Sequence, residues 1–157
     1  MGSNCGLAVQ SVTERQLAAR HIQQMGNPEM ATELTLLAWT VALTILQLLV
    51  AIVGATTQFS PPALAGNREP PLEGKGWVGR AQRAHRNMLE SLVPFAALVL
   101  IVNAAAVSNE ATVLGAKLFL YGRIAYALIY LAGIPWVRTV AWTVSLFGML
   151  MILWQVI

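Results

Sequence analysis

Long stretches without charged residues dominate the pattern of polar and apolar positions along the chain. Residues 34–67 contain no charge at all. Three later stretches contain at most one charge each: residues 91–109, 118–137 and 139–157. Because about 20 apolar residues are enough for a helix to cross a bilayer, we predict four membrane-spanning helices, the first at Thr32–Ala55. Open sheet edges cannot face lipid, so the predicted fold class is an all-α integral membrane four-helix bundle.

The connections between these stretches differ in length. Residues 56–77 form one long loop whose prolines and glycines argue against a regular helix. The second link, residues 107–111, is short, and the third is a tight turn at residues 133–135. Short links predict that consecutive helices are antiparallel neighbours.

Composition supports a membrane protein and argues against other classes. Apolar residues make up 57% of the 157 residues and charged residues only 11%, about half the charged share of a soluble domain. A net charge of +3 without a basic face argues against nucleic acid as a partner. Residues 1–29 lack sustained apolar periodicity, and we interpret them as a mobile N-terminal extension to a transmembrane domain at 30–157. The sequence shows no metal-ligand cluster and no nucleophile–base pair.

Basic residues gather at the first and third connections. They are Arg68, Lys75, Arg80, Arg83, Arg86 and Arg138. The positive-inside rule therefore places loops 56–77 and 133–137 in the cytoplasm and both termini on the other side.

Polar residues continue from the first loop into the second span. Arg83, Asn87 and Glu90 follow helical spacing and share one face with Pro94, while Arg86 lies one turn before Glu90. Glu90 would lie too deep for headgroup contact, and an unpaired carboxylate at that depth is costly. We expect Glu90 to face a cation or a wet cavity.

The third span has a matching polar stripe. Arg123, Tyr126 and Tyr130 recur at helical spacing, and Arg138 follows just after the turn. Two such stripes at similar depth predict a cationic cavity open to the cytoplasm. Guanidinium groups bind carboxylates in bidentate fashion, so an anionic ligand suits this cavity, and Glu90 can hold a ligand ammonium or orient an arginine.

These residues also have purely structural interpretations. Arg80 can extend from a helix end to the headgroups, and Arg138 can be a positive-inside anchor. Arg86 or Arg123 can pair with Glu90 to hold helices together. The two tyrosines can be packing residues.

Two segments resemble signatures of the MAPEG family, the membrane-associated proteins of eicosanoid and glutathione metabolism. RAQRAHRNMLESLVPF, residues 80–95, is similar to the family's second-helix motif, and YGRIAYALIYLAGIPWVRT, residues 121–139, is similar to its third-helix stretch. The likeness covers roughly residues 31–157 and is strongest to bacterial members. It implies a homotrimer in a bacterial inner membrane, with glutathione as co-substrate bound between neighbouring subunits.

The resemblance also implies roles for individual residues. Arg138 matches the arginine that stabilises the glutathione thiolate, and Thr139 stands where some members have serine. The expected glutathione-binding residues are Arg83, Arg86, Asn87, Glu90, Arg123, Tyr126, Tyr130 and Thr139. The implied activity is conjugation of glutathione to hydrophobic electrophiles arriving from the bilayer, or reduction of lipid peroxides.

One departure from the family pattern supports an alternative function. Members with well-defined glutathione sites have an arginine near the end of the first span, where this chain has Thr56, Thr57 and Gln58. The alternative is a non-catalytic lipid-binding or scaffold member of the same fold.

Overall fold

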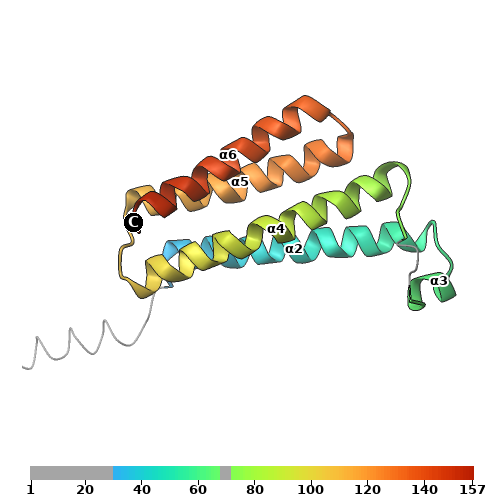
Figure 1. Cartoon of the computed structure of the whole chain (residues 1–157), viewed down its shortest axis with the longest axis horizontal. Coiled ribbons are helices and arrows are strands. Elements are labelled where there is room, and N and C mark those ends of the chain that lie inside the picture. Colours follow the sequence, from blue (N-terminus) through green and yellow to red (C-terminus); the bar gives the residue numbers. More distant parts are fainter. Residues whose placement is uncertain (1–29, 68–71) are drawn as a thin grey trace, which may run out of the picture. The chain divides into compact units, whose positions relative to one another are not determined.

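Helices occupy most of the described chain, which in this computed structural model comprises residues 30–67 and 72–157. In chain order the helices are α2 (Thr32–Thr56), α3 (Pro61–Ala65), α4 (Gly76–Ala104), α5 (Glu110–Ala132) and α6 (Pro135–Trp154). All except α3 are long and apolar enough to cross a membrane. In Figure 1 these four helices run along a common axis, with α2 beside α4 and α5 beside α6. The predicted all-helical membrane bundle is confirmed, whereas the predicted N-terminal extension at 1–29 lies outside the described residues.

Local chemistry fixes both ends of α5. The Asn109 side chain accepts hydrogen bonds from the backbone N–H groups of Ala111 and Thr112, at 2.9 and 3.0 Å. The Thr112 hydroxyl in turn accepts one from the Asn109 N–H, which completes a capping box. At the other end Gly133 adopts φ +83°, a left-handed conformation that favours glycine, and Pro135 begins α6. These two signals explain why both links are short.

The long first connection differs from the sequence prediction. Its prolines and glycines argue against a regular helix, but Pro61–Ala65 forms one short helix. Proline is tolerated in the first turn of a helix because the N–H groups of that turn have no intrahelical acceptor. The α2–α4 loop therefore contains a helical turn despite its prolines.

Two glutamines hold the end of this loop in place. Gln58 accepts a hydrogen bond from the Lys75 N–H at 2.7 Å and donates one to the Lys75 carbonyl at 3.0 Å. Gln82 accepts a hydrogen bond from the Gly74 N–H at 2.9 Å. The residues just before α4 are therefore tied both to the end of α2 and to the second turn of α4.

Close backbone approach joins α5 to α6. A Cβ atom on Gly115 would lie only 2.6 Å from the Gly148 carbonyl oxygen, and one on Gly122 would collide with the Ser145 hydroxyl. Small residues at the contact between two helices are typical of helix pairs in membranes.

Between α4 and α5, the rings of Phe95 and Phe119 stack with centroids 3.9 Å apart.

Many large apolar side chains are exposed on the bundle surface, as expected for lipid contact. Trp39, Trp136 and Trp154 are all well exposed, Trp136 at 85%.

Helix α4 contains Pro94 within its apolar half. Because proline lacks a backbone N–H, the usual helical hydrogen bond from this position is absent.

Glu33, in the first turn of α2, is a buried carboxylate that the sequence pattern did not reveal. Its side chain is only 2% exposed. One carboxylate oxygen accepts hydrogen bonds from Ser108 at 2.7 Å and Thr112 at 2.5 Å, while the other has no partner among the described residues. Glu33 therefore joins the start of α2 to the α4–α5 link and to the first turn of α5.

Candidate functional site

Arg123 is buried in the bundle rather than exposed to lipid. Its side chain is 1% exposed, and its Nη1 donates a hydrogen bond of 2.7 Å to the Asn87 side-chain oxygen. The guanidinium carbon lies 5.4 Å from the Phe119 ring centroid and 5.6 Å from that of Tyr126. The buried Nε and Nη2 atoms have no hydrogen-bond partner in the described part of the chain. Unpaired donors on a buried arginine are expensive, and here the surrounding side chains keep both atoms out of contact with solvent.

The polar contacts continue from Arg123 towards α6. The rings of Tyr126 and Tyr130 lie 5.3 Å apart, and the Arg138 guanidinium carbon lies 4.8 Å from the Tyr130 ring centroid. Tyr126 also packs against Ala84 of α4 and Ala141 of α6. We call the resulting set from α4, α5 and α6 the arginine–tyrosine cluster; its members are Asn87, Arg123, Tyr126, Tyr130 and Arg138.

Four predicted site residues lie outside this contact chain: Arg83, Arg86, Glu90 and Thr139. Glu90 is exposed and forms no ion pair with Arg86, Arg123 or any other described residue. The hydrogen-bonding partner of Arg123 on α4 is instead Asn87, one turn earlier. Thr139 is exposed, and its hydroxyl is 3.5 Å from the Pro135 carbonyl oxygen.

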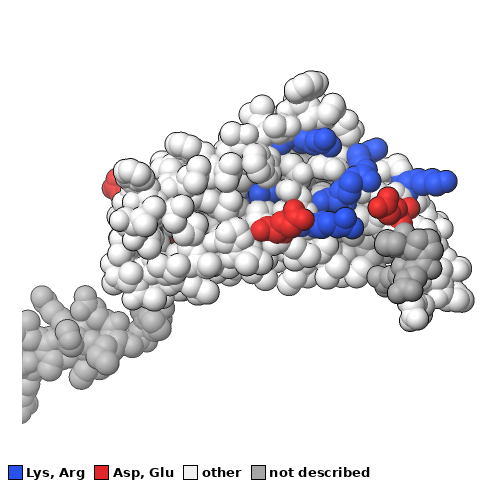
Figure 2. Space-filling view, viewed as in Figure 1, with Lys and Arg blue, Asp and Glu red and all other residues white. Residues whose placement is uncertain are grey.

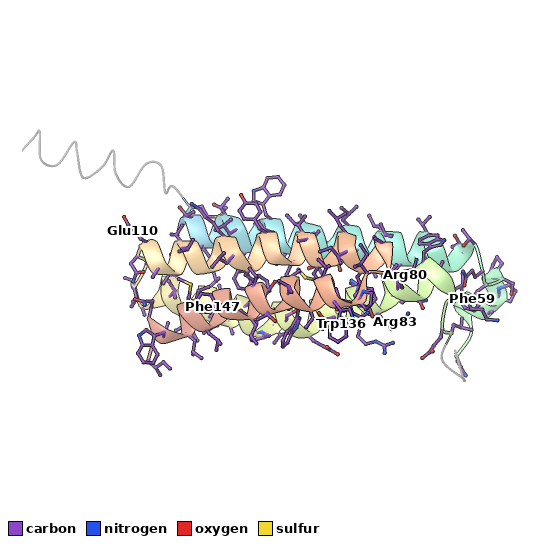
Figure 3. The ribbon with its side chains drawn as sticks, turned by 90° about the horizontal axis from the view of Figure 1, so that it is seen from above. Phe59, Arg80, Arg83, Glu110, Trp136 and Phe147 are labelled. Atoms are coloured by element: carbon purple, nitrogen blue, oxygen red, sulfur yellow. The ribbon has the colours of Figure 1, made fainter. Side chains whose placement is uncertain are left out.

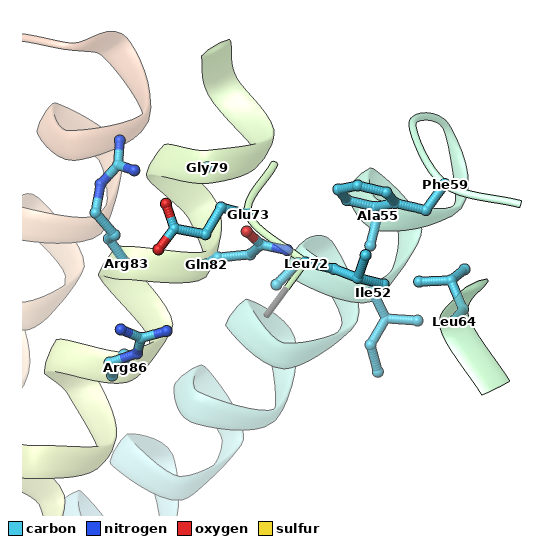
Figure 4. Close-up of a pocket in the computed structure, with 11 residues that line it drawn as sticks. Ile52, Ala55, Phe59, Leu64, Leu72, Glu73, Gly79, Gln82, Arg83 and Arg86 are labelled. Atoms are coloured by element: carbon cyan, nitrogen blue, oxygen red, sulfur yellow. The ribbon is translucent and has the colours of Figure 1, made fainter. Parts of the chain in front are cut away.

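Arg83 and Arg86 line a cavity on another side of α4. This loop-end cavity has a volume of about 560 Å³. Its apolar wall comes from α2, α3 and the loop: Ala51, Ile52, Ala55, Phe59, Leu64 and Leu72. Its polar wall comes from α4 and the loop: Glu73, Gln82, Arg83 and Arg86, with Gly79 between them. In Figure 4 the Glu73 carboxylate extends towards Arg83 and Arg86, with Phe59, Ile52 and Leu64 on the far side.

Glu73 is a candidate that the sequence pattern did not reveal. It lies in the proline- and glycine-rich loop, and it forms no ion pair with the arginines or with any other described residue. Its position depends on the hydrogen bonds by which Gln58 and Gln82 fix Lys75 and Gly74. The position of Glu73 could be predicted only by knowing that Gln58 and Gln82 bind the backbone of Lys75 and Gly74, and the sequence pattern does not show these hydrogen bonds.

Arg80 forms a contact within the protein, in addition to any contact with lipid headgroups. Its Nε donates a hydrogen bond of 3.0 Å to the Leu131 carbonyl oxygen, near the C-terminus of α5. A cation at a helix C-terminus is favourable because the last carbonyls lack helical donors. Arg80 therefore fixes the first turn of α4 against the last turn of α5.

The charged groups of the spans concentrate at one end of the bundle. Figure 2 shows the basic side chains together with acidic ones over one half of this face, while most of the other half is uncharged. In Figure 3 Arg80, Arg83 and Trp136 lie towards the end with the α2–α4 loop, and Glu110 lies at the opposite end. One shared cavity was predicted from the two stripes, but the described residues divide differently: five predicted residues form the arginine–tyrosine cluster, and Arg83 and Arg86 line the loop-end cavity.

Comparison with known proteins assigns the family. Searches of curated proteins and of solved structures find no match to the chain. The sequence model of the MAPEG family matches residues 36–157. This match includes α4, α5 and α6 entirely and all but the first turn of α2. With four apolar helices and the match over most of its length, the chain belongs to the MAPEG family, whose members include glutathione transferases and peroxidases.

Proposed function

We propose that the protein is a membrane-bound glutathione transferase-like enzyme that works as a homotrimer at the cytoplasmic side of the membrane. It would conjugate glutathione to hydrophobic electrophiles or use it to reduce lipid peroxides. The observation that carries this proposal is the loop-end cavity, in which Arg83 and Arg86 lie on the side towards which the Glu73 carboxylate extends.

The charges around this cavity complement those of glutathione. The tripeptide has two carboxylates and one ammonium, and the cavity presents two guanidinium groups and the Glu73 carboxylate. Guanidinium forks bind carboxylates by paired, charge-assisted hydrogen bonds. The exposed Glu90 lies one turn after Arg86 on α4 and would be a further contact for the ligand, whereas Asn87 would act through the Arg123 guanidinium that it binds. In a trimer, the neighbouring subunit would complete this binding site.

Arg138 is the residue we assign to the chemical step. A free thiol has a pKa of about 8.5, and a nearby guanidinium favours its thiolate form. Arg138 lies over the Tyr130 ring at the start of α6, and this contact limits its freedom. The thiolate formed there would attack the electrophile, forming a carbon–sulfur bond while the leaving group departs with its electron pair.

The test of this assignment is Arg138→Ala, with Arg138→Lys as the charge-preserving control. We expect Arg138→Ala to lower kcat for conjugation of 1-chloro-2,4-dinitrobenzene at least tenfold, because the developing thiolate loses its cation. Arg138→Lys should retain much more activity, and glutathione affinity measured by calorimetry should change little in both. Unchanged turnover in Arg138→Ala with an intact trimer removes Arg138 from the mechanism.

A specific observation favours the alternative, a non-catalytic lipid-binding or scaffold member. Thr56, Thr57 and Gln58 stand near the place where members with well-defined glutathione sites have an arginine, and the Gln58 side chain holds the Lys75 backbone. In this alternative one carboxylate clamp is missing and the segment has a structural role. Melting experiments with glutathione discriminate the two functions, since a ligand that binds only the folded protein raises its melting temperature. The enzyme should be stabilised, and the scaffold should not.

A further inference from the structure

A basic corner lies at the loop end of the bundle, where the start of α4 meets the turn between α5 and α6. The Arg80 side chain reaches across to this turn, and its Nε donates a hydrogen bond of 3.0 Å to the Leu131 carbonyl oxygen. A Cβ atom added to Gly133 would lie 3.5 Å from the Arg80 guanidinium carbon, so the guanidinium lies against the turn. We call Arg80, Leu131, Gly133 and the nearby Trp136 the Arg80 corner.

The hydrogen bond to Leu131 uses only part of the Arg80 guanidinium. Its two Nη groups form no hydrogen bond with a described residue, and neither nitrogen is fully buried. Arg80 also forms no ion pair with Glu73 or Glu90, the described carboxylates of the preceding loop and of α4. Because the Nε contact fixes the plane of the group, its free edge is oriented for an acceptor from outside the chain. Guanidinium groups bind phosphate oxygens through paired hydrogen bonds.

Exposed aromatic and aliphatic side chains place this corner at the membrane surface. Trp136 follows Gly133 by three residues and is well exposed, and Ile134 and Val137 beside it are about half exposed. In Figure 3 Arg80 and Trp136 lie towards the same end of the bundle. Tryptophan is enriched where a membrane span meets the headgroups. The corner therefore presents apolar groups to the acyl chains and a guanidinium to the headgroup layer.

The charge of the C-terminal half of the chain favours an anion at this corner. From residue 111 onwards the sequence contains Lys117, Arg123 and Arg138 but no aspartate or glutamate. An anionic group beside the α5–α6 turn therefore meets no carboxylate from either helix after the first residue of α5. Basic places between spans on the cytoplasmic side are typical binding sites for anionic headgroups.

We propose that the Arg80 corner binds the headgroup of an anionic phospholipid such as phosphatidylglycerol, whose phosphate oxygens accept hydrogen bonds from the Arg80 Nη groups. The bound headgroup lies over the junction of α4 with the α5–α6 turn and stabilises it. A ligand that binds only the folded protein raises its melting temperature. This inference concerns lipid binding alone and does not depend on the glutathione chemistry.

The experiment compares the melting temperature of the protein in phosphatidylcholine nanodiscs with that in nanodiscs that also contain phosphatidylglycerol with the same acyl chains. The readout is the increase that phosphatidylglycerol causes, so a loss of stability common to both lipids cancels. The wild type should show an increase of several degrees, and Arg80→Gln should lose most of it. Lys75→Gln, which removes one exposed positive charge at the same end of the bundle, is the matched control and should keep the increase.

A second pair of variants leaves Arg80 in place. Ala132 is exposed at the end of α5, between the two residues that contact Arg80. Ala132→Glu should lose most of the increase, because the new carboxylate repels the phosphate or pairs with Arg80 in its place. Ala132→Gln, the neutral control, should keep it.

Three results would overturn the proposal. The first is a wild type that phosphatidylglycerol does not stabilise. The second is an equal loss in Arg80→Gln and Lys75→Gln, which would show only a general effect of basic charge. The third is an increase that survives in both Arg80→Gln and Ala132→Glu. Inorganic phosphate added to the phosphatidylcholine nanodiscs should not stabilise the wild type, and an increase equal to that caused by phosphatidylglycerol would contradict a lipid as the ligand.

Discussion

The arginines of this protein differ in how deeply they are buried, and a buried arginine has a different role from an exposed one. Arg123 is buried and bonded to Asn87, so its removal affects packing as well as charge. Arg83 and Arg86 are exposed at a cavity and have no ion pair with described residues, so they remain available to a ligand. Replacing Glu73, which lines the same cavity, tests ligand binding most directly, because the replacement breaks no ion pair with a described residue.

We expect Glu73→Gln to weaken glutathione binding about 3- to 10-fold, because the ligand ammonium exchanges an ionised carboxylate acceptor for a neutral amide oxygen. Isothermal calorimetry on the detergent-solubilised protein measures this affinity. Glu110→Gln, at the opposite end of the bundle, is the matched control and should bind as the wild type does. Glu90→Gln should also bind more weakly; unaltered affinity in either site variant argues against that carboxylate as a ligand contact.

Among the elements, the α5–α6 pair depends on its glycines. The two backbones approach each other so closely that no larger side chain fits at the contact positions. These positions are Gly115 facing Gly148 and Gly122 facing Ser145. This pairing places Tyr130 of α5 beside Arg138 of α6. The geometry of the arginine–tyrosine cluster is therefore set by residues that bind nothing themselves.

Gly122→Leu tests this dependence. The added side chain would collide with Ser145 and the Ala141 carbonyl, so α5 and α6 must separate. We expect destabilisation of about 1–3 kcal/mol, typical of overpacking, and a melting temperature several degrees lower. Val140→Leu, an enlargement at an exposed position of α6, is the control. A melting temperature equal to that of the wild type would show that the helices can adjust without loss.

Across the whole molecule, the two ends of the bundle carry different chemistry. One end holds Arg83, Arg86 and Arg138 and opens into the loop-end cavity. The other end holds the buried Glu33 with its hydroxyl donors. Charge bias of this kind orients membrane proteins, so the loop end should face the cytoplasm.

Single cysteines introduced in a Cys5→Ser background measure the orientation. We expect a membrane-impermeant maleimide to label Asn103→Cys but not Ser60→Cys in intact cells of a bacterial expression host. Both positions are exposed, so access depends on the side of the membrane. Inverted vesicles should reverse the pattern. Labelling of Ser60→Cys in intact cells contradicts the proposed cytoplasmic site.

The helices were predictable because an uncharged run of about 20 residues, in a chain this apolar, is typical of a membrane span. Arg123 stood out for the same reason, as the one charge within residues 118–137. Its partner was not predictable, because helical spacing defines a face but not how two helices are rotated against each other. Glu33 was not predictable because it lies just before the uncharged run, where a polar helix end is ordinary. The position of Glu73 depends on hydrogen bonds between distant segments, which no local pattern reveals.

Pro94 has a consequence for the main chain of α4. The N–H group that would bond to the Glu90 carbonyl oxygen in a regular helix does not exist at this position. That oxygen loses its helical donor halfway along the helix, and the proline ring crowds it. The hydrogen-bond ladder of α4 is therefore interrupted at the junction between its charged and its apolar half, which is where a membrane helix bends most readily.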